Sequence, residues 1–411
     1  MLRRLLILIA VAVAVLSGVS APTPAYAAVA TEAVFNDPVN DRTAIQNRIV
    51  QLIEGADAGS TIRMSMFYAT DATIPNALIT ARNNGRNVQI VFDKKMAGTP
   101  ILAALTAALG TDTTAGSWVL ACPSGRGCIG DRALYGSVSL NHNKFFLFSR
   151  TGGTDDVVVQ SSANLHTGRD GLGGWNAALV LAGNAGIHDA YAAYFTDLKN
   201  QGVNNNYYDA RPPVTSGAAK VHFYPRQEST SSPTDPAEDT MTTVLDNVQC
   251  TGNSTVGTVD GTHRTIVRVA MGIFSRTHLA QKLLALDRAG CYVEVAVNHN
   301  KDSSAEVSSM NELVKTTGVY NGINVRYFCT ADPVWVHSKY LLVEGKYYGG
   351  PDRKIVWTGS HNWSWNSLRQ ADEALLQLED GTIFDRFRSN YYALRVAGGI
   401  RAAGNGTPAS C

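Results

Sequence analysis

Two short patterns of residues that can act on phosphate each occur twice in the chain. His-Asn-Lys at 142–144 is followed by Ser-Ala-Asn at 162–164, and His-Ser-Lys at 337–339 is followed by Ser-His-Asn at 360–362. Imidazole serves as a nucleophile or a general acid, while ammonium and amide groups bind phosphoryl oxygens. A strand places residues two apart on one face, so each His would project with its Lys. Two such strands facing each other predict one composite phosphate site.

The two copies are expected to share one set of roles. The histidines would carry proton transfer and nucleophilic attack, and the lysines would stabilise phosphoryl charge. The expected catalytic residues are His142, Lys144, His337 and Lys339, and the expected substrate-binding residues are Ser162, Asn164, Ser360 and Asn362. Neither Ser has the Gly-x-Ser-x-Gly context of a hydrolase nucleophile, which favours oxygen-binding or structural hydroxyls. His361 either reaches the site or lies on an exposed loop.

The similarity between the halves extends beyond these patterns. The apolar run at 62–67 resembles 267–272, and the run at 88–93 resembles 293–298, both at an offset of 205. Helical patterns alternate with these runs, which favours α/β sandwiches with mixed sheets. The sequence therefore predicts two similar α-β-α sandwich halves related by a pseudo-twofold axis.

Each half is expected to contain its elements in the same order. Helices are expected at 41–55, 72–84, 237–248 and 277–289, and late strands at 176–182 and 373–379, each late strand leading into a closing helix. The N-terminal half would comprise 28–202 and the C-terminal half 240–411. The segment 203–239, with its Pro and Ser clusters, is interpreted as a connector. A strand at 220–224 would match residues 33–35.

The N-terminal segment 1–27 is typical of a secretory signal peptide. It combines Arg3 and Arg4 with an apolar stretch and a small-residue end at 25–27. Without it, 33 basic residues face 34 acidic ones, so the mature chain has no global field that would attract polyanions. We expect a secreted protein that is a monomer and whose partner is a phospholipid or a membrane surface rather than nucleic acid.

All six cysteines lie in the exported part, where disulfides persist. Cys122 and Cys128 would close a small loop. Cys250 with Cys291 and Cys329 with Cys411 is the favoured pairing of the rest, although the sequence allows fifteen connectivities. No Cys-x-x-Cys or Cys/His cluster indicates zinc, so no metal and no cofactor is expected.

The doubled His-x-Lys with a downstream Ser-x-Asn resembles the phospholipase D superfamily over nearly the whole mature chain. The resemblance implies metal-free phosphodiester cleavage in two steps through a phosphohistidine. Water or an alcohol would then take the phosphoryl group, the second case being transphosphatidylation. The chain departs from the family pattern, because Ser149 and Glu344 stand at the two motif Asp positions and Ser161 replaces a Gly. The motif Asp does not react, so its loss would weaken ion pairing more than chemistry.

The resemblance also implies a residue in each half that accepts a hydrogen bond from a motif His. Asn176 and Glu373, which open the late strands, occupy these positions. A carboxylate raises the pKa of its His, whereas an amide only orients the ring. If each serves its own half, His337 is the general acid and His142 the nucleophile.

The expected substrate is a glycerophospholipid, cleaved to phosphatidic acid and a free head group. Four Trp flank the expected site and would form an aromatic rim at a lipid interface or pack in the core: Trp175, Trp335, Trp363 and Trp365. Two alternatives stay open, a secreted nuclease of the same superfamily and a weakly active phosphate-binding protein. A basic groove built from five arginines would indicate the nuclease: Arg126, Arg132, Arg150, Arg169 and Arg369.

Overall fold

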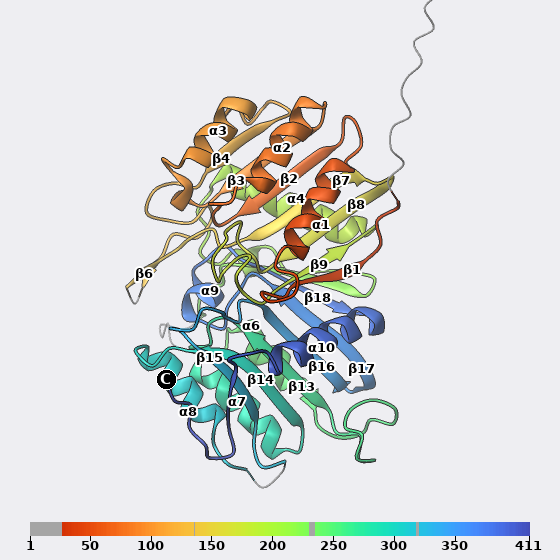
Figure 1. The fold of residues 1–411 in the computed structure, drawn as a ribbon, viewed down its shortest axis with the longest axis vertical. Helices are drawn as coiled ribbons and strands as arrows, with labels where there is room; N and C mark the ends of the chain where they lie inside the picture. The colour runs from red at the N-terminus through yellow and green to blue at the C-terminus, as the bar shows by residue number, and fades with distance from the viewer. Residues whose placement is uncertain (1–26, 135, 230–234, 318–319) are drawn as a thin grey trace, which may run out of the picture.

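The computed structural model describes residues 27–134, 136–229, 235–317 and 320–411 and shows two similar halves stacked along the long axis (Figure 1). The N-terminal half is built on a seven-stranded mixed sheet with the order β1-β9-β8-β7-β2-β3-β4. Its strands are β1 (Glu32–Asn36), β2 (Thr61–Met66), β3 (Asn87–Phe92), β4 (Trp118–Ala121), β7 (Lys144–Thr151), β8 (Thr154–Ser161) and β9 (Asn176–Leu181). Its helices are α1 (Ala44–Glu54), α2 (Thr73–Asn83), α3 (Pro100–Leu109) and α4 (Ala185–Asn200), with a 3-10 turn at Lys94–Met96 and a hairpin of β5 (Ala133–Leu134) and β6 (Ser137–Val138).

The C-terminal half repeats this plan on a larger sheet with the order β10-β11-β18-β17-β16-β13-β14-β15-β19. Its strands are β10 (Val214–Ser216), β11 (Ala219–Phe223), β12 (Val248–Gln249), β13 (Ile266–Met271), β14 (Tyr292–His299), β15 (Asn324–Cys329), β16 (Lys339–Tyr347), β17 (Gly350–Gly359), β18 (Ala374–Glu379) and β19 (Arg401–Ala403). The helices of this part of the chain are α5 (Tyr207–Ala210), α6 (Thr240–Asp246), α7 (Thr277–Arg288), α8 (Ser304–Leu313), α9 (Trp365–Arg369) and α10 (Gly381–Arg395).

The predicted repeat and the α/β class are confirmed. In both halves the first two central strands run parallel, β2 with β3 and β13 with β14, and the His-x-Lys strand pairs antiparallel beside them. The closing helices begin alike, because the side chains of Asn184 and Asp380 accept from the backbone N–H three residues on. Compared with the expected ranges, most of the expected helices end or begin one to three residues inside the predicted limit.

Three hydrophobic cores hold the halves. One lies under α1, α2 and α3 and contains Ile62, Met64 and Phe146, and a second lies under α6, α7 and α8. The third joins the halves, because it includes Phe145 and Tyr194 from one and Phe387 from the other. Each sheet is therefore covered on one face by its own helices and on the other by α4, α10 and the opposite half.

Part of the segment interpreted as a connector belongs to the C-terminal sheet. Strand β11 pairs antiparallel with β18, as β1 pairs with β9 in the N-terminal half. The strand expected at 220–224 is therefore present, displaced by one residue, and it is the structural counterpart of β1. It brings Tyr224 beside Glu373, since the Tyr224 N–H donates to the Glu373 carbonyl.

The three expected disulfides are present. They join Cys122 to Cys128, Cys250 to Cys291 and Cys329 to Cys411. The expected signal peptide lies outside the described residues except for Ala27. Within the described ranges, no helix is both long and apolar enough to cross a bilayer.

The two motif Asp positions lie at the far ends of their strands from the motif His. Glu344 is buried and forms ion pairs with Arg268 at 3.0 Å and Arg388 at 3.3 Å. In the N-terminal half the Ser149 hydroxyl instead accepts from the Thr61 N–H. The Ser149 substitution therefore removes an ion pair from the sheet and leaves the reacting groups untouched.

Replacing Glu344 with Gln is expected to lower the free energy of unfolding by about 2 kcal/mol, because it leaves Arg268 and Arg388 less compensated at a buried site. Urea unfolding measures this loss. Glu379→Gln is the matched control, since its ion pair with Arg353 is more exposed and should change stability by less than about 1 kcal/mol. Equal losses in the two variants would contradict the burial argument.

Candidate active site

The two His-x-Lys strands meet where the halves exchange backbone hydrogen bonds. The His142 N–H donates to the Asp372 carbonyl at 3.0 Å, and the His337 N–H donates to the Trp175 carbonyl at 2.8 Å. Asp372 and Trp175 each precede the opposite half's orienting residue, so these bonds fix the motif of one half against the late strand of the other. The predicted composite arrangement arises from this exchange.

The orienting residues serve the opposite half. His142 Nδ1 lies 2.8 Å from Glu373 Oε1, and His337 Nδ1 lies 3.0 Å from Asn176 Oδ1. The premise that each orienting residue serves its own half is therefore wrong. The physical reason is the backbone exchange, which places the start of each late strand beside the other half's His.

The Asn176 amide is held by contacts that fix which way it points. Its Nδ2 donates to the Gly171 carbonyl at 2.8 Å, and its Oδ1 accepts from the Ser162 hydroxyl at 2.8 Å. An Oδ1 acceptor requires that His337 carry its proton on Nδ1, which leaves Nε2 available for proton transfer. The Ser162 hydroxyl thus positions Asn176, and its binding of substrate stays a prediction. The hydroxyls of Ser162 and Ser360 also accept from the backbone N–H groups of Ala177 and Ala374, respectively.

Both motif lysines are fully buried and lie against their own motifs. Lys144 Nζ donates to the His142 carbonyl at 2.7 Å, and Lys339 Nζ donates to the His337 carbonyl at 2.5 Å. Burial lowers the pKa of Lys144 to about 7, with the Glu373 carboxylate opposing the shift. Burial also lowers the pKa of Lys339 well below its usual range, and the charge of Lys144 adds to that. Two lysines whose charged forms are destabilised at one buried site favour binding of an anion between them.

The histidines are neutral at rest for the same reason. Burial lowers the pKa of His142 to about 4, although the Glu373 carboxylate pulls it upward. Burial lowers the pKa of His337 well below its usual range, assisted by the charges of Lys339 and Lys144. For Glu373, burial raises the pKa, but the interactions with His142 and Lys144 outweigh burial, so the pKa is lowered. His142 exposes 12% of its side chain, so the ring can be reached from outside.

Asn164 and Asn362 occupy equivalent positions in the two halves, but their side chains form different hydrogen bonds. Asn164 donates to Asp170 at 3.2 Å, and Asn362 Oδ1 accepts from the Ile273 N–H at 3.0 Å. Asp170 contributes to the electrostatics of both motif lysines and accepts a hydrogen bond from the Tyr68 hydroxyl. The sequence reasoning missed Asp170, whose position in a Gly-rich loop after Asn164 is the only signal.

Asp372 is a second residue that the sequence reasoning missed. Its buried carboxylate accepts from the backbone N–H groups of Cys128, Ile129 and Gly130 at 2.7, 3.1 and 2.7 Å. The disulfide from Cys122 to Cys128 closes the loop that presents these donors. Burial raises the pKa of Asp372 to about 7 against these three hydrogen bonds. The loop of one half thereby holds the residue before Glu373 in the other.

The four Trp near the motifs do not form a common rim. Trp175 and Trp363 are buried in the cores, as the packing interpretation held. Trp335 is half-buried under the Arg169 guanidinium, which lies 3.8 Å from the ring centre. Trp365 is half-buried between Arg132 and Arg276. His361 is 2% exposed, so the exposed-loop interpretation is wrong.

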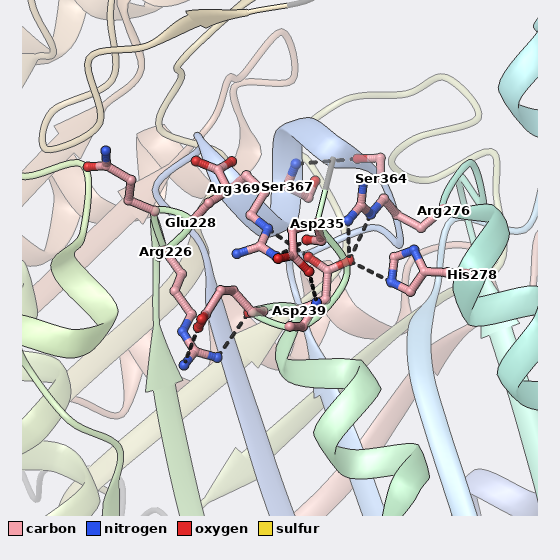
Figure 2. Close-up of polar contacts among 12 residues, drawn as sticks. Arg226, Glu228, Asp235, Asp239, Arg276, His278, Ser364, Ser367 and Arg369 are labelled. Carbon is pink, nitrogen blue, oxygen red and sulfur yellow. Dashed lines mark hydrogen bonds and ion pairs between the residues drawn. The ribbon is translucent and has the colours of Figure 1, made fainter. Parts of the chain in front are cut away.

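A buried ion-pair cluster fixes the segment between Asn362 and Glu373. Helix α9 lies in this segment and ends at Arg369, whose side chain is fully buried and 2.7 Å from Asp239 (Figure 2). Arg276 and His278 reach the same carboxylate from the start of α7 at 2.7 and 2.8 Å. The cluster therefore ties α9 to α6 and α7.

The comparisons with known proteins agree with this architecture. The family model described as "Cardiolipin synthase, PLD-like domain" matches residues 49–199 and 261–394, which is more than half of the chain. The chain belongs to the phospholipase D-like family. No curated protein matches the chain in sequence.

Two solved structures with TM-scores above 0.5 share the fold of this phospholipase D-like protein. A phosphatidylserine synthase from Haemophilus influenzae is 12% identical with a TM-score of 0.57, covering 90% of this chain and 88% of its own. A polyphosphate kinase from Porphyromonas gingivalis is 14% identical with a TM-score of 0.52, covering 89% of this chain. The chain spans about half of that kinase, 50% of its length. Identities this low indicate fold alone.

Proposed function

We propose that the protein is a secreted phosphodiesterase that cleaves through a covalent intermediate on His142. The observation that carries the proposal is the crossed pairing, which gives His142 a carboxylate partner and His337 a neutral amide. Lys144 and Lys339 would bind the non-bridging phosphoryl oxygens, with Asn164 and Asn362 as further amide donors.

The reaction begins with attack of His142 Nε2 on phosphorus. A His142–phosphorus bond forms, the bond to the leaving oxygen breaks, and the imidazole ring becomes positively charged. Glu373, which accepts the Nδ1 proton, stabilises that charge. His337 Nε2 gives the leaving oxygen its proton, and the bound phosphodiester anion raises the proton affinity of His337 beforehand.

The second step returns both histidines to their starting state. Water attacks the phosphorus, gives its proton to His337 and releases a phosphate monoester from His142. An alcohol in place of water would give a new phosphodiester.

The assignment of the two histidines depends on the intermediate. The resting pKa alone would favour a carboxylate-paired His as the acid. The phosphorylated ring carries a positive charge, and Glu373 stabilises that charge only if His142 carries the phosphoryl group. This favours His142 as the nucleophile and His337 as the acid.

The activity is expected to depend on pH through two groups. Attack requires neutral His142, which is present above about pH 4, and phosphate binding requires charged Lys144, which is lost as pH rises through about 7. With a p-nitrophenyl phosphodiester, whose leaving group needs no proton from His337, kcat/KM should therefore plateau between these limits and fall on either side. Lys144→Arg should move the alkaline limb upward, because guanidinium stays charged. If the alkaline limb did not move in Lys144→Arg, a group other than Lys144 would set it.

A phospholipid is the proposed substrate. The five arginines that would build a nucleic-acid groove are engaged within the protein. Arg132, Arg150 and Arg369 form ion pairs, and Arg126 and Arg169 donate to backbone carbonyls. Together with the near-neutral charge of the mature chain, this supports a lipid over a polynucleotide.

The proposal is tested by incubating the mature protein with phosphatidylcholine vesicles and ethanol, beside plasmid DNA, with and without a chelator. Phosphatidic acid and phosphatidylethanol that disappear in His142→Ala and in His337→Ala would support it. DNA nicking without lipid turnover would replace it with the nuclease. Binding of vesicles without turnover would favour a phosphate-binding protein. Activity lost on chelation would contradict the metal-free steps.

A further inference from the structure

Glu373 has titratable neighbours on both sides in the C-terminal sheet. Gly359 of β17 lies opposite Leu375 of β18, and the Ser360 N–H donates to the Ala374 carbonyl. One further step in this register places His361 opposite Glu373. Paired residues share a face of a sheet, so their side chains leave the backbone on the same side.

Tyr224 continues the row on the other side of Glu373. Its N–H donates to the Glu373 carbonyl at 3.0 Å, one step beyond the pairing of Phe223 with Ala374. The rings of Tyr224 and His361 are nearly parallel, with an interplanar angle of 10° and centroids 6.1 Å apart. Glu373 therefore lies between an imidazole and a phenol within one row.

Polar atoms in this row lack partners among the described residues. Glu373 Oε1 takes the His142 contact, whereas Oε2 is buried without a hydrogen-bond partner. Both ring nitrogens of His361 are likewise buried without one. A side-chain hydrogen bond from Ser360 is among the interactions that lower the pKa of Glu373, and a carboxylate oxygen can accept a second donor beside it. An unpaired carboxylate oxygen is costly in a buried site, and a buried imidazole N–H beside it can satisfy it.

The N-terminal half has no counterpart of this arrangement. Ala163 stands where His361 stands in the second Ser-x-Asn pattern, and Asn36 pairs with Asn176 where Tyr224 lies beside Glu373. The Asn176 amide is already engaged by His337, Ser162 and Gly171. The extra imidazole thus occurs only behind the charged orienting residue.

We propose that His361 is a positioning residue that donates a ring N–H to Glu373 Oε2, so that the carboxylate accepts from His142 on one side and His361 on the other. This inference rests on the proposed function of the site. Burial lowers the pKa of His361 to about 4, so the ring is neutral and keeps one N–H to donate. The donated bond favours ionised Glu373 and aligns Oε1 with His142 Nδ1.

The charged and titratable groups around His361 set the direction of the expected effect. They are Glu373, Lys339, His142, His222 and Tyr224. Loss of the donor would make the His142–Glu373 pair easier to protonate. The acid limb of kcat/KM, which reports this coupled pair, should therefore move upward.

The kinetic test follows hydrolysis of bis(p-nitrophenyl) phosphate as a function of pH. His361→Phe keeps a ring without a donor and should raise the acid limb by roughly one pH unit and lower kcat more than it changes KM. An amide donor in His361→Asn or His361→Gln should restore the limb. His188→Gln removes another buried His, far along the chain, and should leave the limb in place. An unmoved limb in His361→Phe would overturn the proposal.

A second readout does not require turnover. In protein labelled with ¹⁵N-histidine, the signal absent from His361→Asn identifies the His361 ring N–H. We expect this proton to exchange slowly and to shift in Glu373→Gln. Fast exchange with no response to Glu373→Gln would overturn the positioning role. A responsive signal in a protein that cleaves no phosphodiester would support the contact and reject the proposed function.

Discussion

Replacing His142 with Gln is expected to reduce phosphodiester turnover by on the order of 10⁴-fold or more, because the residue forms the bond to phosphorus. Gln keeps a polar side chain at the site but cannot form the phosphorylated ring. The same change should abolish the covalent intermediate, measured by acid quenching with a ³²P-labelled phosphodiester and peptide mapping. In the unsubstituted protein the label should lie on the peptide that contains His142.

The label itself decides between the two histidines. Phosphate on His337 would reverse the proposed roles, and the argument from the charge of the intermediate would be wrong. His337→Gln should still form the intermediate when the leaving group is p-nitrophenolate, which needs no protonation. His188→Gln, a buried His of the N-terminal half outside the site, is the control and should retain turnover.

Replacing Asp239 with Ala should lower the free energy of unfolding by about 3–5 kcal/mol, because two buried guanidiniums lose their shared carboxylate. Arg369 is fully buried, and Arg276 exposes 9% of its side chain. Urea unfolding followed by tryptophan fluorescence measures the change. Helix α9 lies between Asn362 and Glu373, so turnover should fall as well.

The control for Asp239 is an exposed ion pair of the same chemistry. Asp246 pairs with Lys282, and their side chains are 48% and 39% exposed. Asp246→Ala should therefore cost less than about 1 kcal/mol. If both variants lost the same stability, the cluster at Asp239 would have no special structural role.

Much of the fold was accessible from the sequence because local patterns and repeats specify it. The alternation of helices and apolar runs predicted both sheets, and the offset of 205 between the halves predicted their common order. The disulfides present are the favoured pairing among the fifteen that the sequence allows. The paired His-x-Lys patterns indicated one shared phosphate site, since a strand fixes which residues project together.

Burial could not be predicted in the same way. Trp175 and Trp363 flank the motifs in sequence but point into the cores, and His361 is buried beside Glu373. Three of the arginines that were to indicate a nuclease form ion pairs with residues far along the chain, as Arg369 does with Asp239. Such contacts cannot be predicted from distance along the sequence, because they depend on how the helices and strands pack against one another.

The sequence by itself determined that His142, Lys144, His337 and Lys339 occur as two equivalent pairs, and the structure places them at the starts of β7 and β16. Only the tertiary structure decided which orienting residue each His receives. A pairing within each half and a pairing between halves have the same local sequence pattern and differ only in the backbone hydrogen bonds that join the halves. Those bonds cross the interface, and they give the one charged partner, Glu373, to His142.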